Sequence, residues 1–367
     1  MMKQQNRTTK FASAITCAIL AVSAFTPMRA FSQAPAADGT NARVNDALKR
    51  AAKYLVSAQD PATGVIVHAK GAGNATAMTS LAILAFSAMG HQPGDASPEG
   101  EAMKRALDFV LKAEHQEKDG YFGQKDGSRM YGHGIITLML AEMLGMGADE
   151  KQDALIRERC RKGVELILKA QRVRKSEENA GGWRYDPGAT DSDMSITCWQ
   201  TMALRAAKNA GLDVPKESVD LAARYIKKLH DKSQKAQGIG GFGYASVGHE
   251  LSTTAEGLLA LQVCGDYESE EVKLASELLF KTPPKVGDSW FHYTTYYYAQ
   301  GMYQRGGKYE TEGKKVIASV MLSNPGQGRD GAWEGPGNEA GNGKIYATSL
   351  AVLALAVKNH FLPIYQR

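Results

Sequence analysis

The chain has 367 residues, of which 43% are hydrophobic and 23% are charged. This balance is typical of a globular protein with a large core, and it excludes a disordered, collagen-like or disulfide-scaffold chain. The formal net charge is +5, but residues 1–34 hold four of the 44 basic residues and no acidic residue, so 40 bases face 39 acids in the remainder. With a net charge so close to zero, residues 35–367 lack the overall positive electrostatic potential with which proteins bind nucleic acid or an anionic membrane.

Residues 1–34 resemble a bacterial secretory signal peptide. Three basic residues precede an apolar run at residues 11–25, which small residues follow. The run is shorter than the ~20 residues that span a bilayer, and no second long apolar stretch follows. We therefore expect cleavage near residue 34, a short linker at 35–43, and a single domain at 44–367 that is periplasmic or secreted and has no transmembrane segment.

A repeat organises the chain after residue 44. Each unit has an amphipathic helix, a turn of glycine and a large apolar residue, and a second helix with few charges. The first helices have one wet face, because apolar residues recur at helical spacing with Lys and Arg between them. Glycine allows the tight reversal, and the aromatic residue plugs the gap between helix pairs. The turns are centred on 64–66, 120–122, 181–183, 240–242, 288–290 and 331–333.

The second helices are apolar nearly all round, which predicts that they are buried on every side. They cover residues 75–89, 131–144, 194–209, 251–263, 293–303 and 345–358. Six amphipathic helices that alternate with six apolar helices predict an all-α fold, an (α/α)6 toroid with inner and outer helical rings. An open solenoid is the alternative, since helix pairs also stack linearly. Cys160, Cys198 and Cys264 have no close spacing, which favours small buried apolar residues over a disulfide framework or a zinc cluster.

One turn carries a family resemblance. The sequence Gln116-Glu-Lys-Asp-Gly120-Tyr-Phe122 resembles the prenyltransferase and squalene-cyclase repeat, whose signature is Gln, three residues, Gly, one residue, then Trp or Phe. The other turns match its Gly-aromatic end with altered spacing. The resemblance implies a toroid of the superfamily that includes terpenoid cyclases, zinc-dependent protein prenyltransferases and exported bacterial proteins of unassigned reaction. Fold alone does not decide among these.

Asp191 and Asp193 are the candidate catalytic residues. They precede the third apolar helix, where the resemblance to proton-initiated cyclases implies Asp-x-Asp-Asp, but Met194 replaces the last carboxylate. A carboxylic acid of that kind needs neighbouring groups that tune its acidity. The other interpretation is structural, with either aspartate capping the helix that follows.

The zinc-dependent branch fits poorly. Cys198 follows Asp193 by five residues and His292 could approach from another helix, but the close Asp-x-Cys pairing of that branch is absent. Three histidines and two aspartates could hold a divalent metal, yet their spacing is nonlocal. We therefore predict neither a metal nor a cofactor.

Polar residues gather where the second helices begin. In a closed ring these helices bring their N-termini to one mouth, so His133, His249, Glu250 and His292 become candidate ligand-binding residues together with the aspartates. Each alone is compatible with a structural role. Tyr293, Tyr296 and Tyr297 fall near one helix face, and aromatic faces line both carbocation cavities and sugar-binding clefts. Ordinary packing between the rings is the alternative.

Together these patterns favour an exported binding toroid with a polar mouth, whose ligand is an isoprenoid, a glycan or a protein. The alternative is a terpenoid cyclase-like enzyme that uses the Asp191 and Asp193 region. Against the enzyme stand the carboxylate missing at Met194 and the lack of the second α-barrel that triterpene cyclases add, since one ring uses all of residues 44–367.

Overall fold

The computed structural model describes residues 39–67, 73–323, 326–359 and 361–365. The predicted signal peptide lies outside these residues. The first helix, α1, begins at Gly39, inside the stretch predicted as a linker.

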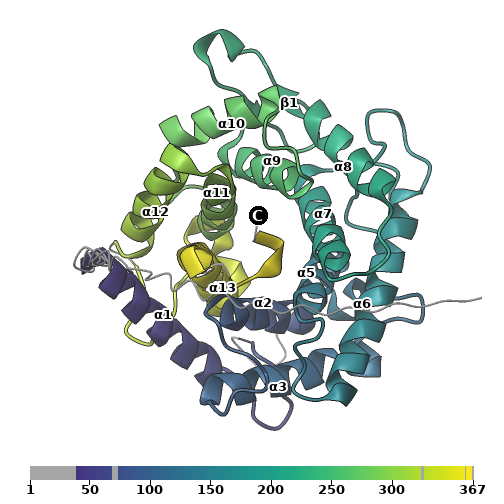
Figure 1. The fold of residues 1–367 in the computed structure, drawn as a ribbon, viewed down its shortest axis with the longest axis vertical. Coiled ribbons are helices and arrows are strands. Elements are labelled where there is room, and N and C mark those ends of the chain that lie inside the picture. The colour runs from purple at the N-terminus through teal and green to yellow at the C-terminus, as the bar shows by residue number, and fades with distance from the viewer. Residues whose placement is uncertain (1–38, 68–72, 324–325, 360, 366–367) are drawn as a thin grey trace, which may run out of the picture. The chain divides into compact units, whose positions relative to one another are not determined.

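Twelve long helices of the described chain form two concentric rings, as predicted (Figure 1). The outer helices are α1 (Gly39–Ser57), α3 (Pro98–Val110), α6 (Glu150–Gln171), α8 (Lys216–Lys228), α10 (Glu270–Lys281) and α12 (Gly307–Met321). The inner helices are α2 (Ala75–Ala88), α5 (Arg129–Glu142), α7 (Met194–Asn209), α9 (Leu251–Val263), α11 (Phe291–Arg305) and α13 (Gly343–Leu355). A short helix, α4 (Gly123–Asp126), and a small hairpin of β1 (His230–Asp231) and β2 (Gly241–Phe242) lie in the turns.

The inner ring is closed. Each inner helix packs against the next, and α13 packs against α2, so the first and last units meet. In an open solenoid α2 and α13 would not be in contact. The stretch Gly337–Asn359, which contains α13, is long and apolar enough to cross a bilayer, but most of it is buried within the ring.

A repeated glutamine joins each turn to its neighbour. Gln116 Nε2 donates to the carbonyl oxygens of Gly120, in its own turn, and of Arg159, on the next outer helix, at 2.9 and 3.0 Å. Gln59 and Gln171 make the same pair of bonds in their units. Gln327 donates to Gly331 and to Ala47 of α1, both at 2.8 Å, and so fastens the last unit to the first.

The turn glycine is required by the approach of the next outer helix. Gly331 has a φ of +90°, and a Cβ there would lie 2.4 Å from the carbonyl oxygen of Arg50 on α1. Gly64, Gly120 and Gly181 stand in the same relation to α3, α6 and α8. Both the left-handed backbone and the missing side chain are therefore needed at this position.

The large apolar residue of the turn is buried in five of the six units: Ile66, Phe122, Trp183, Phe242 and Trp333. Trp290 is the exception and corrects the sequence interpretation. It lies directly before α11, in a left-handed conformation, and is 45% exposed, so it does not plug a gap.

The last described residues close one end of the ring, inside the inner helices (Figure 1). Ile364 N donates to the buried carboxyl group of Glu142 at the end of α5. Asn359 Nδ2 donates to Ala88 O at the end of α2. The C-terminal segment thus covers the ends of the inner helices and leaves their N-terminal ends free to form a site.

Candidate functional site

A cavity of about 1230 Å³ lies at the N-terminal end of the inner helices. All six inner helices contribute to its wall through their first two turns. We call Asn74, Arg129, Glu250 and Trp290 the cavity mouth, because they stand at or beside the helix starts. We call Leu81, Ile135, Trp199, Glu256 and Leu350, which lie further along the helices, the cavity floor.

Glu256 is the ionisable residue of the floor. It stands in the middle of α9 and its side chain is 1% exposed. Ser195 Oγ donates to Glu256 Oε1 at 3.2 Å, but Oε2 has no hydrogen-bond partner among the described residues. The indole Nε1 of Trp199 is likewise unpartnered. Buried polar atoms in native proteins are nearly always satisfied, so these two are candidates to bind a ligand.

The surroundings of Glu256 favour its neutral form. Burial raises the pKa of this carboxyl group well above its ordinary value, and the Asp193 carboxylate adds to the rise, whereas the Ser195 and Tyr293 hydroxyls oppose it. Tyr131 donates to the Tyr293 hydroxyl at 3.1 Å. The deep part of the cavity therefore combines aliphatic and aromatic side chains with an acid whose neutral form is favoured and with a hydrogen-bonded tyrosine pair.

Strained backbone is concentrated at the mouth. Asn74, Arg129 and Trp290 are the non-glycine residues of the described chain with positive φ, at 62°, 56° and 54°. All three lie at inner-helix starts and line the cavity. A left-handed conformation costs a residue with a Cβ about 1 kcal/mol or more.

Two of the three strained starts, those of α2 and α11, are capped by a carboxylate from the following unit. Asp126 accepts hydrogen bonds from the backbone N–H groups of Thr76 and Ala77 at the start of α2. Glu339 does the same for His292 and Tyr293 at the start of α11. In all four bonds the donor is a backbone N–H group of the capped helix. The bonds therefore stabilise the left-handed helix starts, but they do not determine why the side chains of Asn74 and Trp290 line the cavity.

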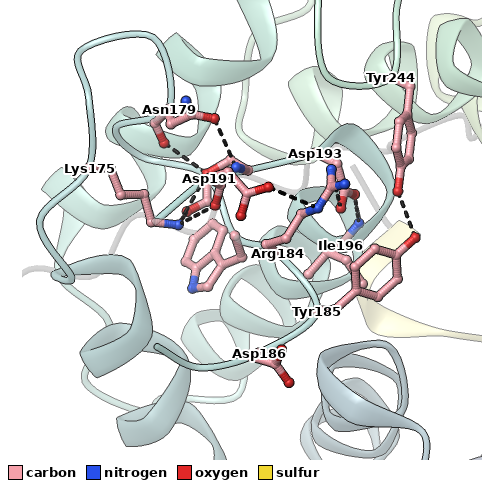
Figure 2. A network of polar contacts seen from close by, with 12 residues as sticks. Lys175, Asn179, Arg184, Tyr185, Asp186, Asp191, Asp193, Ile196 and Tyr244 are labelled. Atoms are coloured by element: carbon pink, nitrogen blue, oxygen red, sulfur yellow. Dashed lines mark hydrogen bonds and ion pairs between the residues drawn. The ribbon is translucent and has the colours of Figure 1, made fainter. Parts of the chain in front are cut away.

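Asp193 caps α7 and does not line the cavity. Its Oδ1 accepts from Ile196 N at 2.8 Å, and its Oδ2 lies 3.3 Å from Nη1 of Arg184 (Figure 2). Burial raises the pKa of Asp193 to about 6, although the bond from Ile196 and the Arg184 charge oppose the rise. Asp191 pairs with the same arginine, but 60% of its side chain is exposed. Neither carboxylate faces the chamber in which an acid catalyst would act.

The same arginine connects the capping network to the cavity wall. Arg184 lies over the rings of Tyr185 and Tyr244, with centroid distances of 5.2 and 5.4 Å. The hydroxyls of these two tyrosines, which line the cavity, are 2.6 Å apart (Figure 2). Arg184 therefore packs against the two wall tyrosines without lining the cavity itself.

His133 is buried in the turn structure. Its Nδ1 accepts from Phe122 N at 3.3 Å, and its Nε2 lies 3.1 Å from Gly163 O. In four other units a threonine hydroxyl binds the same turn N–H, namely Thr79, Thr197, Thr254 and Thr348. His133 thus replaces a structural threonine, and burial lowers its pKa to about 4.

The other histidines also lie away from the cavity wall. His292 is buried with Nε2 3.1 Å from Glu334 O, and burial lowers its pKa to about 4. His249 pairs with Asp231 at 2.8 Å on a largely exposed side chain. The expected ring of three histidines around one mouth does not form, and no group of three or more His, Cys, Asp or Glu within the described ranges is arranged to hold a metal.

Two of the predicted ligand-binding residues do line the cavity: Glu250 at the mouth and Tyr293 in the wall. Tyr296 and Tyr297 are not among the lining residues. Both contact Trp199 of the floor, Tyr296 by stacking at a centroid distance of 5.9 Å and Tyr297 edge-to-face at 5.8 Å. Sequence reasoning missed Glu256. The available signal was a single acidic residue inside the otherwise uncharged segment 251–263.

Comparisons with known proteins support the fold and leave the family open. No family model matches the chain, and no curated protein matches it. Among solved structures, a GH76A α-1,6-mannanase from Salegentibacter sp. superposes with a TM-score of 0.57 and 10% identity over 87% of this chain and 99% of that one. A type II terpene cyclase from Scytonema gives a TM-score of 0.56 and 15% identity over 88% and 99%. At such identities the likeness shows the α/α-toroid fold alone.

Proposed function

We propose that this protein is an exported toroid that binds an uncharged, largely apolar molecule in its central cavity. The observation that carries the proposal is the floor, where aliphatic and aromatic side chains surround a buried glutamic acid that has one unpartnered oxygen. At about 1230 Å³ the cavity exceeds the usual range of roughly 300 to 1,000 Å³ for small-molecule pockets. An elongated lipid-sized molecule would have room.

Charge argues against an anionic ligand. The mouth and wall contain the carboxylates Glu250 and Asp288, while the guanidinium of Arg129 is paired with Asp186. Moving a negative charge from water into the buried floor of the cavity without a cation is costly. A neutral molecule avoids this cost and gains from the burial of its apolar surface.

An isoprenoid is the ligand class we favour over a glycan. A sugar needs many polar partners. The cavity has polar side chains along its mouth and wall, whereas its floor offers mainly apolar contacts from Leu81, Ile135 and Leu350. Cyclisation through Asp191 and Asp193 has no support from their positions, since one is exposed and the other is used as a helix cap. Export rests on the sequence of residues 1–34.

The test is displacement of N-phenyl-1-naphthylamine, an uncharged dye that fluoresces in apolar sites. We expect the purified protein to bind the dye, farnesol to displace it, and α-1,6-mannotriose to leave it bound. Displacement by the sugar but not by farnesol would favour a glycan site, and no dye binding at all would refute the proposed function.

A further inference from the structure

We infer that the floor of the cavity recognises an acceptor oxygen on its ligand through the carboxyl group of Glu256. The inference rests on the proposed function and narrows the ligand to an uncharged molecule with a carbonyl, ether or hydroxyl oxygen at the end that enters first. It follows from the bonding of this side chain and from the groups around it.

The hydrogen bonds of Glu256 leave one donor for the cavity. A protonated carboxyl group has one O–H donor besides its acceptor sites. Oε1 is engaged by the Ser195 hydroxyl at 3.2 Å, whereas Oε2 has no partner within the described part of the chain. With the proton on Oε2, the group donates into the space that it lines.

Within the described residues, the titratable and polar groups that interact electrostatically with Glu256 include no cation. They are Tyr131 of α5, Asp193 at the N-cap of α7, Ser195 and Cys198 of α7, Tyr293 and Tyr297 of α11, and Tyr346 of α13. None of these residues can neutralise a carboxylate. The fold therefore holds a neutral acid here, and a neutral acid is a donor that an ionised one is not.

Two of the neighbouring hydroxyls have acceptors of their own. Tyr131 donates to Tyr293, and Tyr346 donates to Glu339 at 3.3 Å. The Tyr293 hydroxyl, which accepts from Tyr131, acts on Glu256 and lowers its pKa. Besides Glu256, the unpartnered donor among the floor residues is the indole of Trp199. These two donors can be told apart by substitution.

Two uncharged dyes of similar size test the inference. Prodan, a naphthalene with a propionyl ketone, carries an acceptor oxygen, and its emission moves to longer wavelength when that oxygen is hydrogen-bonded. N-phenyl-1-naphthylamine lacks an oxygen. We expect Glu256→Met to weaken prodan binding roughly tenfold, the effect of one hydrogen bond of about 1.4 kcal/mol, and to leave the other dye unaffected. Glu256→Gln keeps an N–H donor and should preserve prodan affinity.

The pH profile gives a second readout that does not depend on the methionine variant folding. Wild-type affinity for prodan should fall as pH rises and Glu256 ionises, whereas Glu256→Gln should show a flat profile. Glu142→Gln is the matched control, because Glu142 is also a buried glutamate but lies outside the cavity. It should retain the wild-type profile.

The outcomes separate the two proposals. If neither dye binds the wild-type protein, the proposed function itself fails. If both dyes bind, three results would show that the inference about Glu256 is wrong while the binding function stands. The first is that Glu256→Met affects both dyes equally, and the second is that Glu256→Gln keeps the wild-type pH profile. The third is that Trp199→Phe rather than Glu256→Met abolishes the preference for prodan.

Discussion

The guanidinium of Arg184 lies 3.3 Å from Oδ2 of Asp193, the residue whose other carboxylate oxygen caps α7. In the residue that the sequence singled out as a candidate acid, Oδ1 thus accepts the capping bond from Ile196 N, and Oδ2 is ion-paired with Arg184. It also anchors the arginine behind the tyrosine wall of the cavity. Asp193 therefore has a structural role: it caps α7 and holds the arginine that packs against the cavity wall.

Asp193→Ala should lower stability and spare binding. Loss of the cap costs about 0.5 to 2 kcal/mol, and Arg184 loses its buried partner. Asp193→Asn, which can still cap the helix, should lose less. Urea unfolding measures the difference, and dye binding of the folded variants provides the functional control. A folded Asp193→Asn protein that no longer binds would assign this residue to the ligand site.

Gln327→Ala should destabilise the ring at its seam. The variant removes two part-buried hydrogen bonds, one to its own turn and one to α1, which together contribute roughly 1 to 3 kcal/mol. Gln116→Ala removes the same pair of bonds between two internal units and should cost a similar amount. If Gln116→Ala is destabilising and Gln327→Ala is neutral in urea unfolding, the first and last units are not joined in solution.

Trp290 allows backbone strain and side-chain contact to be separated. Glycine relieves the left-handed conformation whereas alanine keeps it, so Trp290→Gly should be more stable than Trp290→Ala by about 1 kcal/mol. Both remove the indole from the mouth and should weaken dye binding equally. Unchanged dye affinity in both variants would show that the exposed ring does not contact the ligand.

Glu142 should make stability fall with rising pH. Burial raises its pKa to about 8, while the bond from Ile364 N opposes the rise. The unfolded chain ionises this group at lower pH than the folded protein does, so the contribution to stability is present at low pH and is lost as pH rises toward 8. The loss is about 1.4 kcal/mol per pH unit within that window.

Glu142→Gln should flatten this dependence between about pH 6 and 8, as measured by urea unfolding at a series of pH values. The glutamine side chain still accepts the bond from Ile364. An unchanged slope in the variant would show that other groups cause the pH dependence.

Much of the ring could be predicted from the sequence, because its determinants are local. The segments 194–209 and 251–263 lack a wet face, and they form α7 and α9 with those bounds. The signature around Gln116 and Gly120 marks the turn that fastens one unit to the next. The capping role of Asp193 was one of two open interpretations.

The site could be predicted only in part, because it depends on how each helix is rotated about its axis. His133 and Glu250 stand near similar helix starts, yet one binds a turn and the other lines the cavity. Glu256 lies in the middle of a helix whose other residues are mostly apolar on every face. In such a helix the sequence does not indicate which side chains line a cavity and which pack against neighbouring helices. Trp290 follows a turn that resembles the others in sequence but leads directly into its helix.

Filling the cavity tests the central claim most directly. Met78 lines the cavity and Met146 does not, and both are partly buried methionines packed on the core. Titration of N-phenyl-1-naphthylamine should give one site per chain for the wild-type protein and for Met146→Trp, and strongly reduced binding for Met78→Trp. Equal dye binding by all three folded proteins would contradict the account, because it would place the ligand site outside the cavity.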